Sequence, residues 1–239
     1  MESMTADPQL SSTAASDLKH ADTWIVIPLF NEATVIADVV AELREQYSNV
    51  LCINDCSTDN SAAVAAAAGA EVINHPINLG QGAALQTGFD YALECGAKYV
   101  ITFDADGQHR LVDANAMLAL ARERDLAIVF GSRFLDDRTK PGLLKKIVLK
   151  TAVWATNLGT RMKLTDAHNG LRVIRADALR LIQLKQDRMA HGTEIVVQLG
   201  RTGLPWAEHP VEVIYTDYSR AKGQSLLNSI NILIDLIIR

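Results

Sequence analysis

Two aspartates that share one short turn are the residues of this sequence best suited to chemistry. Asp104 and Asp106 stand in the segment 104–109 (DADGQH), directly after an apolar run. Two carboxylates held this close disfavour each other's ionisation unless a cation neutralises them, and Mg²⁺ or Mn²⁺ prefer oxygen ligands of this kind. Aspartates at a strand end can also simply cap a helix. The turn therefore predicts a divalent-metal site only in combination with its surroundings.

Two further polar segments have side chains that could bind a nucleotide. In residues 54–61 (NDCSTDNS) an Asx turn leads into a helix cap, and Asp55 could accept hydrogen bonds from a base or a ribose. Residues 78–82 (NLGQG) resemble a glycine loop that binds phosphate, but they match neither the P-loop nor the dinucleotide fingerprint. Nucleotide hydrolases and Rossmann dehydrogenases are therefore disfavoured. Residues 23–31 also lack the glycine-rich basic loop of a nucleotidyltransferase.

The elements that position these loops alternate between strand and helix. Apolar and β-branched runs predict strands over residues 23–29, 50–53, 71–74, 99–103 and 127–130. Helical periodicity fills the intervals and predicts a helix over residues 111–124. This alternation is typical of an α/β domain with a mostly parallel central sheet flanked by helices. The polar loops follow the carboxyl ends of the strands, which is the edge where open α/β sheets bind ligands.

The pattern after Ser132 is less regular and is expected to supply the acceptor side. Helices are predicted over residues 143–157, 176–184 and 193–201, and strands over residues 171–174 and 206–214. No internal repeat or linker divides this half from the first. The expectation is therefore one domain that spans residues 22–225.

Composition and charge narrow the class of protein. A chain of 239 residues can bury a large core without disulfides. Its three cysteines are an odd number with no paired framework, so they are expected to be reduced thiols. The formal net charge of −5 does not suggest a nucleic-acid partner.

The two ends of the chain differ from its middle. Residues 1–21 are rich in small and polar side chains and lack the apolar core of a signal peptide, so a flexible tail is expected. No apolar run reaches the roughly 18–20 residues needed to cross a bilayer. Residues 226–239 carry leucine and isoleucine at helical spacing. Three coverings for this amphipathic C-terminal helix remain open: the domain's own core, a bilayer surface or a membrane-embedded partner.

A set of segments, taken in order and spacing, resembles family 2 glycosyltransferases with the GT-A fold. The segments are residues 28–32 (PLFNE), 54–59 (NDCSTD), 78–83 (NLGQGA), 104–109 (DADGQH) and 131–134 (GSRF). The resemblance is closest to the dolichyl-phosphate mannose synthase and polyprenyl-phosphate glycosyltransferase branch. Residues 165–172 are similar to that branch's Thr-Asp…Gly-Phe-Arg segment, and residues 220–225 to its Arg-x-x-Gly-x-Ser loop. The similarity covers residues 23–225.

The resemblance implies roles for matching residues. The implied metal ligands are Asp104, Asp106 and Gln108. The implied nucleotide-sugar site consists of Pro28, Leu29, Phe30, Asn31, Glu32, Ile53, Asp55, Asn78, Gly82, Asp104, Ala105 and Asp106. The residues implied to face the acceptor or a phosphate are Arg133, Asp166, Arg220 and Lys222. Asp104, Asp106 and Arg133 are the implied catalytic residues.

The resemblance also implies an activity. It is the inverting, metal-dependent transfer of a hexose from a GDP-, UDP- or dTDP-linked donor to a dolichyl-like polyprenyl phosphate. The expected place is the cytoplasmic face of a membrane, reached by the C-terminal helix through the lipid surface or a small membrane subunit, and oligomers are possible. A hydroxyl acceptor would need a base, for which Asp166 and Glu194 are the candidates. His109, His168 and His191 are expected to be structural hydrogen-bonding residues.

Two departures from the family pattern keep alternatives open. The nucleoside loop reads Asn-Asp-Cys-Ser at residues 54–57 where Asp-Asp-Gly-Ser is usual, which leaves the base of the donor undecided. Residues 167–169 read Ala-His-Asn where the lipid-phosphate synthases usually carry Pro-Thr-Ser. A bacterial surface-polysaccharide transferase that acts on a lipid-linked saccharide is therefore the main alternative, and a non-catalytic nucleotide-sugar-binding protein is the second.

Overall fold

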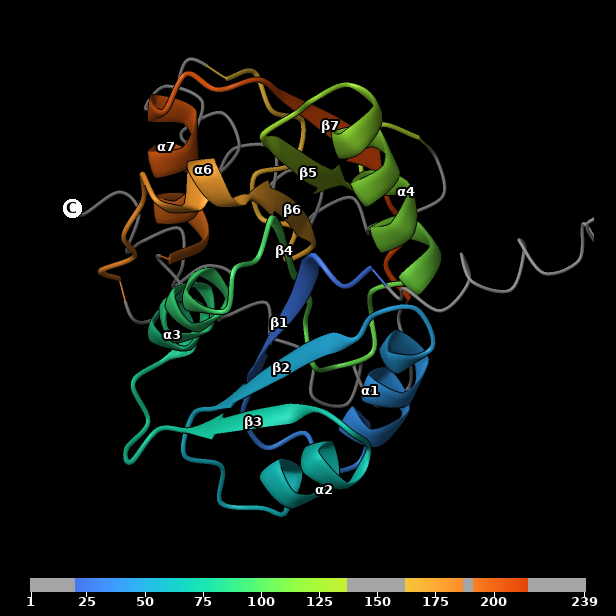
Figure 1. Cartoon of the computed structure of the whole chain (residues 1–239), viewed down its shortest axis with the longest axis vertical. Helices are drawn as coiled ribbons and strands as arrows, with labels where there is room; N and C mark the ends of the chain where they lie inside the picture. The colour runs from blue at the N-terminus through green and yellow to red at the C-terminus, as the bar shows by residue number, and fades with distance from the viewer. Residues whose placement is uncertain (1–19, 137–161, 187–190, 215–239) are drawn as a thin grey trace, which may run out of the picture.

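Seven strands form one central sheet in the part of the chain that the structure describes (Figure 1). The computed structural model describes residues 20–136, 162–186 and 191–214. The strands are β1 (Thr23–Leu29), β2 (Asn49–Asn54), β3 (Glu71–Asn74), β4 (Tyr99–Thr102), β5 (Ile128–Ser132), β6 (Arg172–Arg175) and β7 (Trp206–Pro210). Their order is β3-β2-β1-β4-β6-β5-β7. β6 pairs antiparallel with β4 and β5, and the other pairs are parallel.

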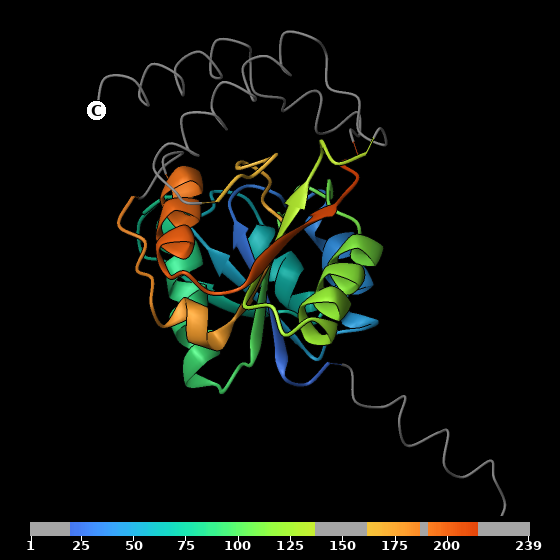
Figure 2. The ribbon, with the colours of Figure 1, turned by 90° about the horizontal axis from the view of Figure 1, so that it is seen from above.

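Helices cover both faces of this sheet (Figure 2). They are α1 (Ile36–Arg44), α2 (Ser61–Ala67), α3 (Gln81–Glu94), α4 (Leu111–Glu123), α6 (Ala176–Leu179) and α7 (His191–Arg201). α1, α2 and α4 pack on one face, and α3, α6 and α7 on the other. Successive strand side chains point to opposite faces, so Val26 of β1 enters one hydrophobic cluster and Ile27 enters the other. The mostly parallel α/β sheet expected from the sequence is confirmed.

The register of the strands brings the polar loops to one edge. Leu29 at the end of β1 pairs with Asn54 at the end of β2. The Asp55 N–H then donates to the Leu29 carbonyl at 2.9 Å, and the Phe103 N–H donates to the Val26 carbonyl at 3.0 Å. The loops after β1, β2 and β4 therefore begin side by side.

Two predicted elements are shorter than their sequence patterns. The helix expected over residues 176–184 ends at Leu179, and the amides of residues 180–182 still bond to main-chain carbonyls of this turn. Beyond them, side chains of other helices bind the segment: Gln198 accepts from the Gln183 N–H and Gln86 from the Leu184 N–H. The strand expected over residues 206–214 ends at Pro210. Beyond Pro210, the Val211 N–H still donates to Ser132 of β5, but the Glu212 N–H donates to the Asp113 carboxylate and the Ile214 N–H to the Gln108 carbonyl. The chain therefore leaves β5 for residues 108–113 at the start of α4.

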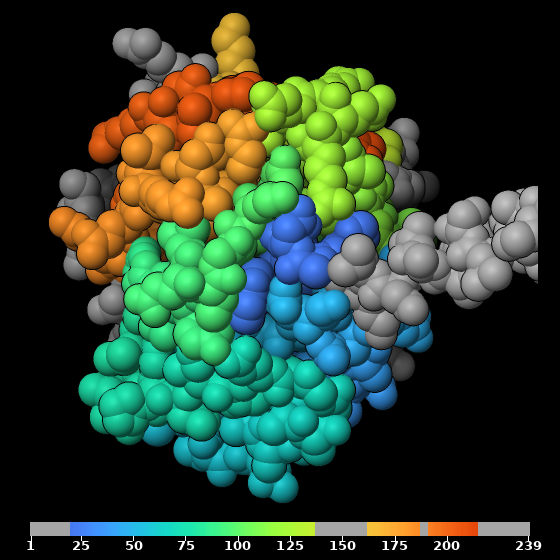
Figure 3. Space-filling view, in the orientation of Figure 1, coloured from blue at the N-terminus to red at the C-terminus, as the bar shows by residue number. Residues whose placement is uncertain are grey.

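Side chains of the second half fill the space beside α3. In the space-filling view the segment around α6 (orange) packs directly against α3 (green) (Figure 3). Cys52, Cys56 and Cys95 are all free thiols, as expected. None of the helices within residues 20–136, 162–186 and 191–214 is long and apolar enough to span a membrane. The helices expected over 143–157 and 226–239 lie outside the described residues.

Candidate functional site

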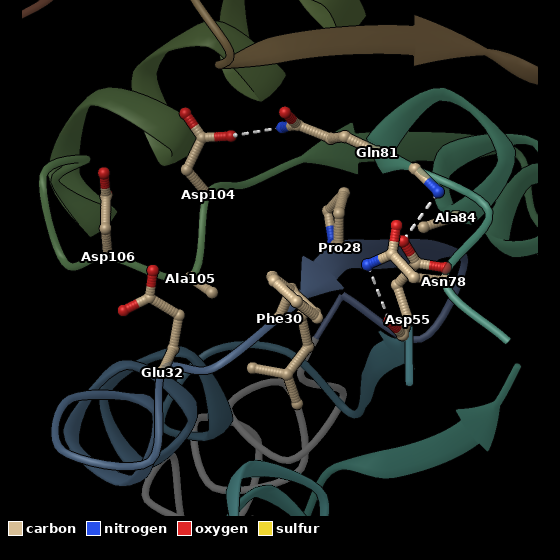
Figure 4. Close-up of a pocket in the computed structure, with 12 residues that line it drawn as sticks. Pro28, Phe30, Glu32, Asp55, Asn78, Gln81, Ala84, Asp104, Ala105 and Asp106 are labelled. Atoms are coloured by element: carbon tan, nitrogen blue, oxygen red, sulfur yellow. Dashed lines mark hydrogen bonds between the residues drawn. The ribbon is translucent and has the colours of Figure 1, made fainter. Parts of the chain in front are cut away.

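A cavity of about 520 Å³ opens at the carboxyl edge of the sheet, between the ends of β1, β2 and β4 and the start of α3 (Figure 4). Its walls are Pro28, Leu29, Phe30, Glu32, Asp55, Asn78, Gly80, Gln81, Ala84, Asp104, Ala105 and Asp106. Figure 4 shows Glu32, Asp104 and Asp106 toward one end and Asp55 with Asn78 toward the other. We call these the metal end and the nucleoside end, after the ligands that the sequence predicts there. The three polar loops predicted from the sequence thus meet in one cavity.

The two aspartates of the metal end have unequal surroundings. Asp104 Oδ2 accepts a 2.8 Å hydrogen bond from His109 Nε2, whereas Oδ1 has a 3.5 Å contact with Gln81 Nε2. Burial acts to raise the pKa of Asp104, but His109 and the Arg172 guanidinium outweigh it and hold the pKa below its usual value. For Asp106, burial and the neighbouring Asp104 charge raise the pKa to about 6. The turn therefore holds one stable carboxylate beside one that its surroundings disfavour.

This donor set fits a divalent cation. Both side chains offer carboxylate oxygens, and the repulsion that raises the pKa of Asp106 is what a cation would relieve. No group of three or more His, Cys, Asp or Glu ligands gathers anywhere in the described part of the chain. Mg²⁺ commonly binds one or two carboxylates and completes its shell with water and substrate phosphates. Asp104 and Asp106 could therefore hold such an ion together with a diphosphate.

The nucleoside end is held by Asp55, which is only 3% exposed. Its Oδ1 accepts from the Leu79 N–H at 2.8 Å and contacts His75 Nδ1 at 2.8 Å, and its Oδ2 accepts from the Gly80 N–H at 2.7 Å. The Asn78 amide donates to the Asp55 carbonyl at 3.1 Å. Asp55 therefore fixes the loop before α3, and its Oδ2, with one partner, keeps a lone pair for a ligand.

Four residues that the resemblance placed in the nucleotide-sugar or metal site do not line the cavity. Asn31 joins two loops, because its side-chain oxygen accepts from the Thr58 N–H at 2.8 Å. Ile53 is fully buried in the core. Gly82 packs so closely that a Cβ would lie 2.0 Å from the Gln186 carbonyl oxygen. Gln108 contributes its N–H to Asp106 Oδ1 at 3.1 Å and its carbonyl to Ile214.

On the expected acceptor side, Arg133 and Asp166 bind each other. Arg133 Nε and Nη2 lie 2.6 and 2.8 Å from the two carboxylate oxygens, and the Asp166 side chain is fully buried. Burial acts to raise the pKa of Asp166, but these bonds from Arg133 hold it below its usual value. The planar guanidinium is thus bound to Asp166 in bidentate fashion. Neither residue lines the cavity, and Arg220 and Lys222 lie outside the described residues.

The other candidate base and the histidines have structural partners. Glu194 accepts from the main-chain N–H groups of Lys185 and Gln186. His168 lies 3.4 Å from the Thr193 hydroxyl, and burial lowers its pKa to about 4. His191 is buried at the start of α7. The structural roles expected of the histidines stay predictions.

Some residues of the site were not singled out from the sequence. Gly80 and Gln81 belong to the 78–82 segment, and Ala84 follows them one turn along α3, so the glycine loop was the available signal. Arg172 ends the 165–172 segment and is buried near Asp104 and Asp166. Glu208 of β7 accepts from the N–H groups of Thr165 and Asp166, and no motif marks it.

Comparison with known proteins gives a family match. Residues 24–181 match the family model described as glycosyl transferase family 2. An uncharacterized protein of Methanocaldococcus jannaschii is 32% identical, over 94% of each chain. A UDP-N-acetylglucosamine–dolichyl-phosphate N-acetylglucosaminyltransferase of Methanococcus voltae is 29% identical, over 85% of this chain and 90% of that one. An undecaprenyl-phosphate mannosyltransferase of Micrococcus luteus is also 29% identical, over 85% and 86%.

The fold matches solved structures as well. Glucosyl-3-phosphoglycerate synthase from Mycobacterium tuberculosis, in complex with Mn²⁺, UDP-glucose and phosphoglyceric acid, superposes with a TM-score of 0.63. The sequence identity is 16%, and the match covers 97% of this chain and 85% of that one. At this identity the likeness shows the fold alone, and it confirms the GT-A fold.

Proposed function

This chain belongs to glycosyl transferase family 2 and is a glycosyltransferase, and we propose that it moves a hexose from a nucleoside diphosphate sugar to a polyprenyl phosphate. The observation that carries the proposal is the single cavity that joins the Asp104–Asp106 turn to the loop held by Asp55. Its two ends suit the two parts of such a donor, a metal-bound diphosphate and a nucleoside.

The donor side rests on the chemistry of the cavity. Pro28 and Phe30 lie between the two ends (Figure 4) and offer apolar surface to a base, while Asp55 Oδ2 offers an acceptor to a base N–H or a ribose hydroxyl. Asp104 and Asp106 would hold Mg²⁺ or Mn²⁺. A divalent ion supplies Lewis-acid stabilisation for the charge that grows on the departing nucleoside diphosphate. The structural relative bound to Mn²⁺ and UDP-glucose supports this assignment.

The choice of a phosphate acceptor rests on the contacts of the two candidate bases, Asp166 and Glu194. Asp166 is bound by Arg133, and Glu194 by main-chain amides. Neither is placed to deprotonate a hydroxyl. A phosphate acceptor is already anionic, so it needs positioning more than deprotonation. The names of the two relatives that act on dolichyl or undecaprenyl phosphate support the same choice.

The proposed reaction is a single displacement. A phosphate oxygen of the acceptor forms a bond to the anomeric carbon while the bond from that carbon to the nucleoside diphosphate breaks, which inverts the anomeric centre. The main cationic candidates for holding the lipid phosphate are Arg220 and Lys222. The chain leaves the described residues at Ile214, bonded to Gln108 beside the metal turn.

Incorporation of labelled hexose into undecaprenyl or dolichyl phosphate tests this function, with UDP-, GDP- and dTDP-hexoses each supplied with Mn²⁺ or EDTA. We expect product from one donor class, only with metal, and an inverted anomeric centre by NMR. Asp106→Asn should lower the rate by about 100-fold or more, since metal stabilisation amounts to several kcal/mol. Asp90→Asn, an exposed site on α3, is the matched control. Turnover of lipid-linked saccharides but not of polyprenyl phosphates would overturn the acceptor assignment.

The lipid acceptor leads us to propose a peripheral position on the cytoplasmic face of the membrane. Residues 226–239 carry leucine and isoleucine at helical spacing and are the proposed contact with the lipid surface or a small membrane subunit. We expect the full chain to float with liposomes and a chain that ends at residue 225 to float less. Equal flotation of both would contradict the role of this segment.

A further inference from the structure

A buried histidine lies behind each end of the cavity. His109 bonds Asp104 at the metal end, and its side chain is 4% exposed; His75 bonds Asp55 at the nucleoside end, and its side chain is 7% exposed. Both contacts measure 2.8 Å, but they use different ring nitrogens, Nε2 in His109 and Nδ1 in His75. Neither histidine lines the cavity. Each can therefore act on a bound ligand only through its aspartate.

The contacts of His109 determine how Asp104 presents its oxygens. His109 Nε2 lies 2.8 Å from Asp104 Oδ2, and because a carboxylate only accepts hydrogen bonds, Nε2 is the donor. The ring itself is held edge-on to Phe103, with centroids 5.4 Å apart. The bond fixes Oδ2 against the protein. Oδ1 has only the 3.5 Å contact with Gln81, so it is the oxygen available to a cation.

Gly170 restricts this carboxylate on a second side. A Cβ at residue 170 would lie 2.2 Å from Asp104 Oδ2, so the main chain before β6 packs directly against it. With His109 on one side and Gly170 on another, Asp104 has little freedom to rotate. Partners of this kind orient metal ligands and commonly change metal affinity 10–100-fold when removed.

His75 is held in a corresponding way at the nucleoside end. Its Nδ1 lies against Asp55 Oδ1 while Nε2 contacts the Thr87 hydroxyl of α3 at 3.0 Å. The same Asp55 carboxylate accepts from the N–H groups of Leu79 and Gly80. His75 therefore links the end of β2 to α3 through the loop that forms one wall of the cavity.

We propose that His109 is a positioning residue for the metal ion and that His75 is the corresponding positioning residue for the nucleoside, each acting through the aspartate that it holds. The inference rests on the proposed function, because it assigns the two ends of the cavity to the two parts of a nucleoside diphosphate sugar. It adds that the two ends can be weakened separately by residues that contact neither ligand.

The test uses the fact that His109 contacts its aspartate through Nε2 and His75 through Nδ1. Glutamine can place its amide near the position of Nε2, whereas asparagine reaches only about as far as Nδ1. Binding of Mn²⁺ alone is measured by the electron paramagnetic resonance of the free ion. Binding of UDP, GDP and dTDP at saturating Mn²⁺ is measured by calorimetry. Circular dichroism and urea unfolding of each variant report whether it is folded.

We expect His109→Leu to weaken Mn²⁺ binding by about 10–100-fold while nucleotide affinity at saturating Mn²⁺ stays roughly unchanged. His109→Gln should restore Mn²⁺ binding and His109→Asn should not. His75→Leu should show the converse, with weaker nucleotide binding, unchanged Mn²⁺ binding and rescue by His75→Asn. If a leucine variant fails to fold, the Gln and Asn variants of that histidine decide the question.

Three results would overturn the inference. One is wild-type Mn²⁺ affinity in a folded His109→Leu chain, another is equal loss in His109→Gln and His109→Asn, and the third is loss of both ligands from either histidine variant. Failure of the proposed function is distinguishable: the wild-type chain itself would then bind neither Mn²⁺ nor any of the three nucleotides, and the inference would fall with it.

Discussion

The two ends of the cavity handle a carboxylate beside the ligand in opposite ways. At the nucleoside end, Asp55 is surrounded by donors from the protein, including the N–H groups of Leu79 and Gly80. At the metal end, Asp104 and Asp106 face each other's charge, and burial together with that charge raises the pKa of Asp106 to about 6. In the folded chain, the Asp55 carboxylate therefore already has its hydrogen-bond donors, whereas the metal end keeps negative charge that a cation can neutralise.

Asp166 resembles Asp55, because donors of the protein bind its carboxylate. Asp166 is fully buried, but both its oxygens accept from Arg133, and the His168 N–H adds a further bond at 3.2 Å. Carboxylates that the protein satisfies should contribute to stability, whereas those that await a ligand should contribute to binding.

The largest effect is expected at Asp166. Replacing Asp166 by Asn leaves the largely buried Arg133 charge without this carboxylate, which should cost about 3–5 kcal/mol of unfolding free energy in urea. Because the pKa of Asp166 is lowered in the folded state, its contribution is present above the unfolded pKa of about 3.9 and is lost as the pH falls through the folded pKa. The difference between wild type and variant should therefore be constant from pH 7 to 5 and shrink in stronger acid. A difference that grows on acidification would contradict the pairing.

The next largest effect is a difference between Asp55 and Asp106 in the unfolding free energy lost on replacement by Asn. Asp55→Asn turns one acceptor that faces buried N–H donors into a donor. An unsatisfied buried group costs roughly 1–3 kcal/mol, and more where a charge is lost, so we expect a loss of about 2–4 kcal/mol. Asp106→Asn removes one of two like charges and should leave the unfolding free energy of the metal-free chain equal or higher. Urea unfolding in EDTA measures both. Similar losses for the two variants would remove the distinction between the ends.

Asp106 should matter for stabilisation by ligand, although its replacement is not expected to destabilise the metal-free chain. A ligand that binds only the folded chain stabilises it by about 2.7 kcal/mol at 100 times its Kd. In a thermal-shift screen of UDP, GDP and dTDP, we expect one nucleotide to raise the Tm, and only with Mn²⁺ or Mg²⁺. Asp106→Asn should abolish the metal-dependent part, and addition of EDTA should do the same to the wild type. An undiminished shift in EDTA would show that the carboxylate pair does not bind the diphosphate through a metal.

The elements of the first half could be predicted because each depends on local pattern. β1 and β3 have the predicted bounds, since β-branched runs and short polar loops define them without distant partners. α6 and β7 are shorter than predicted, and the segments that follow them bind Gln86, Gln198 and Asp113, which lie elsewhere in the chain. Periodicity carries no information about such contacts.

The same distinction applies to the site. The positions of Asp55, Asp104 and Asp106 at strand ends follow from the alternation of strands and helices. Arg133 was expected to face a phosphate, yet its partner is Asp166, 33 residues later. That pairing depends on β6 inserting antiparallel between β4 and β5, which a simple alternation does not predict.

The smallest effect is expected at Gln81, which lines the cavity between its two ends. Its amide reaches Asp104 Oδ1 at 3.5 Å, at the limit of a hydrogen bond, and the side chain is exposed. Gln81→Ala should change the unfolding free energy by less than about 0.5 kcal/mol, as is usual for surface positions, and leave Mn²⁺ affinity nearly unaltered. Because this amide faces the oxygen assigned to the cation, the ion should displace it without loss. A large drop in Mn²⁺ affinity would instead make Gln81 part of the metal site, and the metal end would then depend on the protein as closely as the nucleoside end does.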